Sequence, residues 1–275
     1  MVAQTHWPFS FLRGRETLVL SRDSEMPQPK EKWMSKSHNK TIIIVPTYNE
    51  IGNIEMVYRK IFKATKACDL LIVDDNSPDG TGALAEGIAR KDKRVAVLHR
   101  SGKLGLGSAY VHGMQYALKK DYENVIAMDA DLSHDPVNLP RMLENIKNND
   151  LVIGSRYVKD GGMVNWNARR FLISQIANLY CRFMLGLTQA DCSGGYKCYR
   201  ADLLRKIGLA NIFSPGYSFQ VEILYRAIRA GAKVLEIPII FVNRHEGESK
   251  LSTRELVGFG WTVLKLRWLS WLVKV

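Results

Sequence analysis

Short, continuous runs of apolar residues, separated by helix-like segments, limit the folds that this chain can adopt. The runs occupy residues 41–45, 70–73, 95–98 and 125–128. They do not alternate between polar and apolar positions, so they are typical of strands buried on both faces of a sheet. The segments between them have helical patterns at 54–65, 83–90 and 108–119. Strands that alternate with helices predict an α/β fold with a mostly parallel central sheet and helices on both faces.

Length and composition are those of a protein with a full hydrophobic core. The chain has 275 residues, of which 46% are hydrophobic. Residues 1–40 show no sustained hydrophobic period, and we expect a disordered N-terminal extension there, with Met26 or Met34 as alternative starts. No stretch is long and uncharged enough to span a membrane, which favours a soluble or peripheral protein.

The charge of the chain indicates an anionic partner. The formal net charge is +12 and the pI is near 9.5. Nucleic acid, an acidic membrane surface and phosphorylated substrates all meet this requirement. The aromatic and basic signatures of a nucleic-acid module are missing from the sequence, so we expect no nucleic acid and favour the other two. The four cysteines have no Cys-x-x-Cys spacing, which predicts reduced thiols in a cytosolic setting.

Polar clusters follow three of the predicted strands. They are Pro46 to Glu50, Asp74-Asp75 and Asp129-Ala130-Asp131. Because ligands bind at the carboxyl ends of parallel strands, we expect these clusters to meet at one edge of the sheet. Asp129 and Asp131 would supply two hard oxygen ligands, which suit Mg²⁺ or Mn²⁺ when phosphates complete the coordination. The alternative is that these residues only shape turns and cap helices.

One glycine-rich string raises the possibility of a dinucleotide-binding fold. Gly105-Leu106-Gly107-Ser108-Ala109-Tyr110 has the first two glycines of that fingerprint, but Tyr110 stands in place of the third. The string also follows a polar turn rather than the first strand, so the fingerprint fails. The helix start after Gly105 can still offer backbone amides to an anion.

Six strings, in this order along the chain, resemble the dolichyl-phosphate and polyprenyl-phosphate mannosyltransferases. They are Pro46-Thr47-Tyr48-Asn49-Glu50, Val73-Asp74-Asp75-Asn76-Ser77-Pro78-Asp79-Gly80-Thr81, Gly105-Leu106-Gly107-Ser108-Ala109-Tyr110, Met128-Asp129-Ala130-Asp131-Leu132-Ser133-His134, Gly154-Ser155-Arg156-Tyr157 and Gly247-Glu248-Ser249-Lys250-Leu251. Each string is modest by itself, but the ordered set is specific. The resemblance implies an inverting glycosyltransferase of the GT-A fold at residues 41–251. It also implies transfer of mannose from GDP-mannose to polyprenyl or dolichyl phosphate.

The resemblance assigns the donor to particular residues. The guanosine part would lie against Pro46, Tyr48, Glu50, Val73 and Asp75. The sugar diphosphate and its Mg²⁺ or Mn²⁺ would lie against Asp129, Ala130 and Asp131, with Ser133 as a third metal ligand. Some members carry glutamine where Ser133 stands, and serine is the weaker ligand. Arg156, Arg244 and Lys250 would face the phosphates, and Asp129, Asp131, Arg156 and Arg244 would carry the catalysis.

Arginines are the residues expected to hold the acceptor. The resemblance assigns its phosphate to Arg156, Arg170, Ser174 and Arg244. Guanidinium groups grip phosphate with paired hydrogen bonds, and Arg170 and Ser174, four apart on a predicted helix, share a face. A phosphate monoester is largely dianionic at neutral pH, so it needs cations for positioning and no general base. The alternative for each arginine is a solvated surface charge.

Two apolar segments bear on the lipid. Residues 171–187 form a predicted apolar helix that begins beside Arg170, along which a polyprenyl chain could lie, although core packing explains it equally well. Residues 252–275 form a predicted tryptophan-rich basic helix, with too many cations to span a bilayer. We expect it to lie in the membrane interface; the alternative is docking on a small membrane-spanning partner subunit.

These inferences combine into one hypothesis. The chain would be a peripheral enzyme at the cytoplasmic face of a membrane that makes polyprenyl phosphate mannose with inversion. A hexosyltransferase that takes its sugar from a UDP-sugar is the nearest alternative. A noncatalytic subunit that binds nucleotide sugars is an alternative from a different class, against which the intact acidic and basic clusters argue.

Overall fold

The computed structural model describes residues 40–243 and 253–272. The expected N-terminal extension, Arg244 and Lys250 lie outside the described residues, apart from Lys40 itself.

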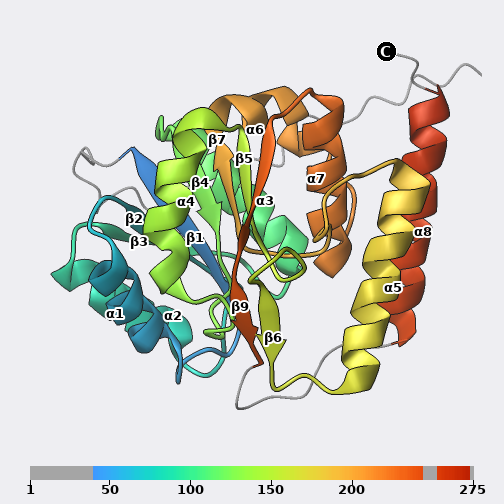
Figure 1. The fold of residues 1–275 in the computed structure, drawn as a ribbon. Helices are drawn as coiled ribbons and strands as arrows, with labels where there is room; N and C mark the ends of the chain where they lie inside the picture. The colour runs from blue at the N-terminus through green and yellow to red at the C-terminus, as the bar shows by residue number, and fades with distance from the viewer. Residues whose placement is uncertain (1–39, 244–252, 273–275) are drawn as a thin grey trace, which may run out of the picture. The chain divides into compact units, whose positions relative to one another are not determined.

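A seven-stranded sheet forms the centre of the fold, with the strand order β3-β2-β1-β4-β7-β5-β8 (Figure 1). The strands are β1 (Thr41–Thr47), β2 (Asp69–Asp74), β3 (Val95–His99), β4 (Asn124–Ala127), β5 (Leu151–Ser155), β7 (Lys197–Arg200) and β8 (Val234–Pro238). All neighbouring pairs are parallel except the two made by β7, which runs antiparallel to β4 and β5. The sequence-based prediction of a mostly parallel sheet is therefore confirmed.

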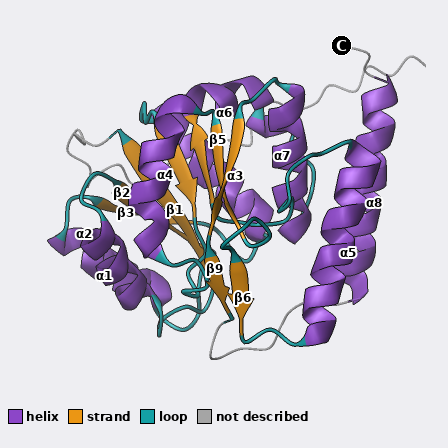
Figure 2. Ribbon diagram, viewed as in Figure 1, coloured by secondary structure: helices purple, strands orange, loops and turns teal. Residues whose placement is uncertain are grey.

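Helices cover both faces of this sheet (Figure 2). They are α1 (Ile54–Ala64), α2 (Thr81–Lys91), α3 (Leu106–Lys119), α4 (Leu139–Asn145), α5 (Ala168–Leu185), α6 (Ala201–Ile207), α7 (Phe219–Arg229) and α8 (Thr253–Leu272), with short 3₁₀ turns at Pro136–Asn138, Ile146–Asn148, Leu209–Asn211 and Gly216–Ser218. Alternate residues of β1 enter opposite cores: Ile43 packs with α1, α2 and α4, whereas Ile44 packs with α3, α6 and α7. Apolar residues on both faces of β1 thus explain its uninterrupted apolar run.

Close packing holds α3 against the sheet. A Cβ atom added at Gly113 would lie 2.6 Å from Cγ2 of Ile44, a separation that only glycine allows. The helix begins after Gly105, whose φ is +97°, and its first turn is thereby brought to the carboxyl end of the central strands. This approach places the glycine-rich string beside the polar clusters.

Two further features lie beyond the carboxyl end of β5. A small parallel sheet joins β6 (Gly162–Val164) to β9 (Ile240–Val242). The long helices α5 and α8 lie side by side, and the Tyr180 hydroxyl donates to the Gly260 carbonyl at 3.3 Å.

Throughout the described residues, no helix combines the length and the apolar character needed to cross a bilayer.

Candidate active site

A cavity of about 260 Å³ lies at the carboxyl edge of the central strands. Residues from the three polar clusters, the start of α3 and the turn before α7 line it: Pro46, Thr47, Tyr48, Glu50, Asp75, Lys103, Gly105, Leu106, Ala109, Asp129, Ala130, Asp131, Gly216 and Tyr217. The structure thus brings together all of the described residues expected at the donor and its metal except Val73, Ser133 and Arg156. The Val73 side chain is fully buried in the core on β2, and Arg156 lines a second cavity.

The carboxylate of Asp129 is oriented by two neighbours. Its Oδ1 accepts a hydrogen bond from the Tyr110 hydroxyl at 2.7 Å. Its backbone N–H donates to Nδ1 of the buried His134 at 3.1 Å, so Nδ1 is the acceptor in this bond. The 3.8 Å between His134 Nδ1 and Asp129 Oδ2 is therefore a contact between two acceptors and not an ion pair. His134 also stacks on Tyr196, so it supports the loop from within the core.

Asp131 lies in a tight turn whose next residue, Leu132, has a φ of +61°. Its Oδ1 accepts hydrogen bonds from both the backbone N–H and the hydroxyl of Ser133. Ser133 is 2% exposed and does not line the cavity. In this arrangement the serine hydroxyl holds the Asp131 carboxylate in place.

The chemistry of these groups fits a divalent cation bound together with a diphosphate. Asp129 and Asp131 both face the cavity with hard carboxylate oxygens, the ligand type that Mg²⁺ and Mn²⁺ prefer. Residues 40–243 and 253–272 contain no group of three or more histidine, cysteine or acidic side chains that could hold a metal by themselves. Two protein carboxylates leave the other positions for phosphate oxygens and water.

The opposite end of the cavity is built around Asp75. Arg100, 7% exposed, donates from Nη1 to Asp75 Oδ1 at 2.7 Å and from Nη2 to the Ser108 hydroxyl at 2.6 Å. The Leu104 N–H donates to the other oxygen of Asp75. Burial raises the pKa of Asp75, and Arg100 offsets only part of that effect. The result is a fixed acceptor at the cavity wall.

An aromatic ring and a cation lie near that acceptor. The Lys103 ammonium lies 4.2 Å from the centroid of the Tyr48 ring, within the range of a cation–π interaction. Both side chains line the cavity. A flat ring beside a carboxylate acceptor is suited to a nucleobase, which stacks on the ring and donates its N–H groups.

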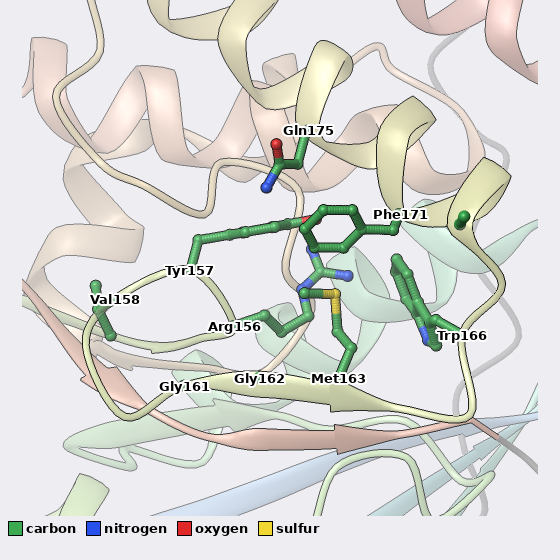
Figure 3. Close-up of a pocket in the computed structure, with 10 residues that line it drawn as sticks. Arg156, Tyr157, Val158, Gly161, Gly162, Met163, Trp166, Phe171 and Gln175 are labelled. Carbon is green, nitrogen blue, oxygen red and sulfur yellow. The ribbon is translucent and has the colours of Figure 1, made fainter.

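A second cavity, of about 560 Å³, contains the buried cation Arg156 (Figure 3). Its walls come from the segment after β5, from β6 and from the start of α5: Tyr157, Val158, Gly161, Gly162, Met163, Trp166, Ala168, Phe171 and Gln175. Figure 3 shows the guanidinium group between the rings of Tyr157, Phe171 and Trp166, beside the Met163 side chain. The cavity therefore combines one cation with largely apolar walls.

Most donors of Arg156 are committed to the protein. Its Nε and Nη2 each donate to Asp191 at 2.7 Å, and Nη2 also donates to the Ser193 hydroxyl. Burial opposes both charges, yet each partner outweighs it, so the pKa of Arg156 is raised and that of Asp191 is lowered. The guanidinium fork that was expected to bind phosphate is thus occupied by Asp191, and within residues 40–243 and 253–272 no hydrogen bond from Nη1 is seen.

Arg170 and Ser174 lie beside the same cavity. Arg170 donates from Nη1 to Asn243 at 2.6 Å, and its guanidinium carbon lies 4.2 Å from the centroid of the Trp166 ring. The Ser174 hydroxyl accepts a hydrogen bond from Tyr157 at 2.7 Å. Three of the four residues expected at the acceptor phosphate are therefore near one another, and the fourth, Arg244, lies outside the described residues.

Several residues at these cavities carry no signal in the sequence. Lys103, Tyr217, Asp191 and Trp166 belong to none of the quoted motifs, and Tyr110 ends one of them without any sign that it contacts Asp129. Asp191 precedes a Gly-Gly pair, as loop residues near a site often do, but that pattern is too common to identify it. Their roles follow from contacts between segments that are distant in the chain.

Comparison with known proteins identifies the family of this chain. Residues 42–208 match the model of "Glycosyl transferase family 2". The chain belongs to this family. It is 48% identical over 213 residues to "Undecaprenyl-phosphate mannosyltransferase" of Micrococcus luteus, covering 78% of this chain and 88% of that protein. It is 45% identical over 215 residues to "Polyprenol monophosphomannose synthase" of Mycolicibacterium smegmatis, covering 78% and 81%.

Solved structures with a similar fold support the GT-A architecture. Glucosyl-3-phosphoglycerate synthase from Mycobacterium tuberculosis, in complex with UDP, aligns with a TM-score of 0.58 at 19% identity and covers 84% of this chain and 81% of that one. The same enzyme with Mn²⁺, UDP and glucosyl-3-phosphoglycerate aligns with a TM-score of 0.58 at 20% identity, covering 86% and 80%. At this identity the likeness establishes the fold, which agrees with the α/β sheet that the sequence predicts.

Proposed function

We propose that this family 2 enzyme transfers mannose from GDP-mannose to a polyprenyl or dolichyl phosphate, with inversion. The observation that carries the proposal is the presence of two cavities whose supporting residues are linked through Phe241. One contains two carboxylates suited to a metal-bound diphosphate, and the other contains a buried arginine within apolar walls. Phe241 contacts His134, which supports Asp129, and lies 5.5 Å from the Arg156 guanidinium. Phe241 thus connects the residues that would hold a sugar donor with the arginine that would hold a lipid phosphate.

The donor would occupy the smaller cavity. Asp75 and Tyr48, with Pro46 and Glu50 beside them, would hold the guanosine, and the Val73 backbone would form the floor beneath it. Asp129 and Asp131, with Ala130 between them, would hold Mg²⁺ or Mn²⁺, and Ser133 would orient Asp131. The cation would neutralise the charge on the departing GDP. Lys250 would face the same phosphates.

The acceptor would occupy the larger cavity. Its phosphate would take hydrogen bonds from Nη1 of Arg156, from Arg170 and Arg244, and from the Ser174 hydroxyl. Such a phosphate is already largely dianionic at neutral pH, so its oxygen can attack the sugar without a general base. Met163, Trp166 and Phe171 would line the path of the first isoprene units.

The relatives support the choice of sugar and lipid. Two proteins of 45–48% identity over most of this chain are named for mannose transfer to undecaprenyl phosphate or polyprenol phosphate. Discrimination between similar substrates depends on the walls of the site, and conserved walls are expected at this identity. The choice of GDP rests on the resemblance of the quoted motifs to those of the dolichyl-phosphate and polyprenyl-phosphate mannosyltransferases.

The membrane would be contacted through α5 and α8. Leu172, Ile176, Leu179 and Phe183 form an exposed apolar stripe on α5. Val257, Trp261, Leu264 and Trp268 form a second exposed stripe on α8. We infer peripheral binding to the cytoplasmic face, where nucleotide sugars are made, with residues 252–275 as an interface helix. A small membrane-spanning partner subunit is the alternative occupant of α8.

A transfer assay tests this function. Purified protein is supplied with polyprenyl phosphate, Mn²⁺ and labelled GDP-mannose or UDP-glucose, and the label in the organic phase is measured. We expect label from GDP-mannose alone, and none after chelation of the metal. Transfer from UDP-glucose alone would identify a glucosyltransferase. Nucleotide binding without transfer from either donor would identify a noncatalytic subunit.

A further inference from the structure

One aromatic ring lies against both of the described arginines expected at the acceptor phosphate. The guanidinium carbon of Arg170 is 4.2 Å from the centroid of the Trp166 ring, and that of Arg156 is 5.5 Å from it. Both distances are within the range of about 6 Å over which a ring face attracts a cation. In the part of the chain that the structure describes, no other ring is shared by these two arginines.

Each arginine also has a polar partner on another segment. Arg156 is paired with the Asp191 carboxylate, and Arg170 donates to the Asn243 side chain. Two guanidinium groups near one cavity repel each other, and a shared contact with the electron-rich face of Trp166 stabilises both cations. The ring therefore helps to keep both cations in place before an anion binds.

The ring itself has a fixed position. Trp166 lies in the short connection between β6 and α5, and its ring meets that of Phe241 edge to face, with centroids 5.6 Å apart. Phe241 belongs to β9, which pairs with β6 through Met163. Two strands thus anchor the ring, and groups held in their final positions bind a ligand without further ordering cost.

We propose that Trp166 is a positioning residue for the acceptor. Its ring sets the spacing of Arg156 and Arg170 so that both reach one phosphate monoester, while its edge forms part of the apolar wall beside the first isoprene unit. The inference rests on the proposed function, because it takes the acceptor to be a lipid phosphate. In this role, Trp166 favours an acceptor in which the phosphate is attached to an apolar group.

Substitutions at Trp166 separate the ring face from simple bulk. Trp166→Leu keeps an apolar side chain but removes the π face, and Trp166→Phe keeps a smaller face. The KM for farnesyl phosphate and the KM for GDP-mannose are measured, and farnesyl phosphate binding is followed by calorimetry without donor. We expect the acceptor KM to rise about tenfold in Trp166→Leu and less in Trp166→Phe, with the donor KM unchanged.

Phe171→Leu is the matched comparison. Phe171 lines the same cavity, but neither arginine lies over its ring within the described residues. We expect its acceptor KM to rise only about twofold, from the loss of apolar wall. Equal effects of Phe171→Leu and Trp166→Leu would make Trp166 a wall and overturn the proposal. An unchanged acceptor KM in Trp166→Leu would do the same.

A double-mutant cycle with Arg170→Gln tests the coupling directly. If Trp166 positions Arg170, the loss of Arg170 should weaken farnesyl phosphate binding less in Trp166→Leu than in the wild type. Additive losses would contradict the proposal. If Trp166→Leu does not fold, as judged by thermal unfolding, the same cycle is run with Trp166→Phe. A wild type that binds farnesyl phosphate but transfers no mannose would refute the proposed function and leave the binding cycle as the test of Trp166.

Discussion

At the residue scale, the two oxygens of Asp129 face different surroundings. Oδ1 accepts a hydrogen bond from the Tyr110 hydroxyl, while Oδ2 has no donor at hydrogen-bonding distance among the described residues. Burial and the nearby Asp129 carboxylate raise the pKa of Tyr110 well above its usual range, so its proton stays in this bond at physiological pH. Tyr110 stands where a dinucleotide fingerprint would need glycine, and here it orients an acidic side chain.

Replacement of Tyr110 by phenylalanine should weaken metal binding. The substitution removes the hydroxyl but keeps the ring that stacks on Phe219. A hydrogen bond to a charged group contributes about 1.5–3 kcal/mol, so we expect the Mn²⁺ concentration for half-maximal activity to rise about tenfold or more. Tyr199→Phe is the control, because the buried Tyr199 hydroxyl has no hydrogen-bond partner among the residues that the structure describes. The same Mn²⁺ dependence in Tyr110→Phe and wild type would refute this role.

Replacement of Asp131 should abolish metal-dependent transfer. Asp131→Asn keeps the size of the side chain but removes the negative charge, and we expect at least a hundredfold loss of activity with GDP-mannose. Circular dichroism and thermal unfolding should show a preserved fold. Asp135→Asn is the comparison, since Asp135 caps the next 3₁₀ turn and asparagine can also cap it. If Asp131→Asn turned over normally, the metal assignment would be wrong.

At the element scale, sequence patterns predict the strands and helices that are uniformly apolar or clearly periodic. The strands β1 to β4 and helices α1 to α3 lie within a few residues of their predicted positions. The strand β7 gave no such signal, because it is short, runs against its neighbours and begins and ends with Lys197 and Arg200. The loop before it, which carries Asp191, has no distinctive local pattern. The carboxylate that pairs with Arg156 therefore comes from a segment that local patterns do not reveal.

The lysine that begins β7 is fully buried in the middle of the sheet. Lys197 pairs with Ala127 and Ile153, and its ammonium donates to the carbonyl and the side-chain oxygen of Gln220. Burial lowers the pKa of Lys197 to about 7, and the nearby positive charge of Arg156 also lowers it. The Asp191 and Glu236 carboxylates act in the opposite direction but do not offset the effect of burial. The free energy of unfolding should therefore depend on the protonation state of this amine.

Lys197 should make stability rise with pH. Below pH 7 the buried amine is charged in the folded protein, so the full cost of removing this charge from water opposes folding. Between pH 7 and about 10.5 the amine is neutral in the folded protein but still protonated in the unfolded chain. The free energy of unfolding should therefore rise across this window, by up to about 1.4 kcal/mol per pH unit, relative to Lys197→Met. Urea unfolding at pH 6.5, 8 and 9.5 measures the difference. Parallel pH profiles of the two proteins would contradict the expectation.

At the scale of the whole molecule, α5 and α8 turn apolar residues toward solvent. The sequence predicts both helices, but it leaves open whether their apolar residues face the core or the outside. The structure buries Cys181 and Leu185 of α5 while it exposes Leu172, Leu179 and Phe183, because only one side of the helix meets the rest of the domain. Arg169 and Arg182 are also exposed, and α5 carries no acidic residue. An anionic bilayer matches this combination of apolar and cationic groups.

Substitution of two tryptophans on α8 tests this surface. Trp261 and Trp268 are 69% and 63% exposed, so Trp261→Gln with Trp268→Gln should leave thermal unfolding nearly unchanged. Burial of each tryptophan ring in the membrane interface stabilises the bound state. We therefore expect the double variant to bind vesicles that contain anionic phospholipid at least tenfold more weakly, as measured by co-sedimentation. Transfer to long polyprenyl phosphate in those vesicles should fall in parallel, whereas transfer to farnesyl phosphate in solution should not.

Val137→Ser is the control for a nonspecific loss of surface hydrophobicity. Val137 is as exposed as the tryptophans, but it lies on the 3₁₀ turn before α4, on the other side of the sheet from α5 and α8. It should bind vesicles as the wild type does. If the double tryptophan variant also bound them normally, α8 would have another partner, and a protein subunit would replace the bilayer as its occupant. If binding and long-chain transfer fell together while farnesyl phosphate remained a substrate, the two helices would deliver the lipid phosphate to Arg156 from the membrane surface.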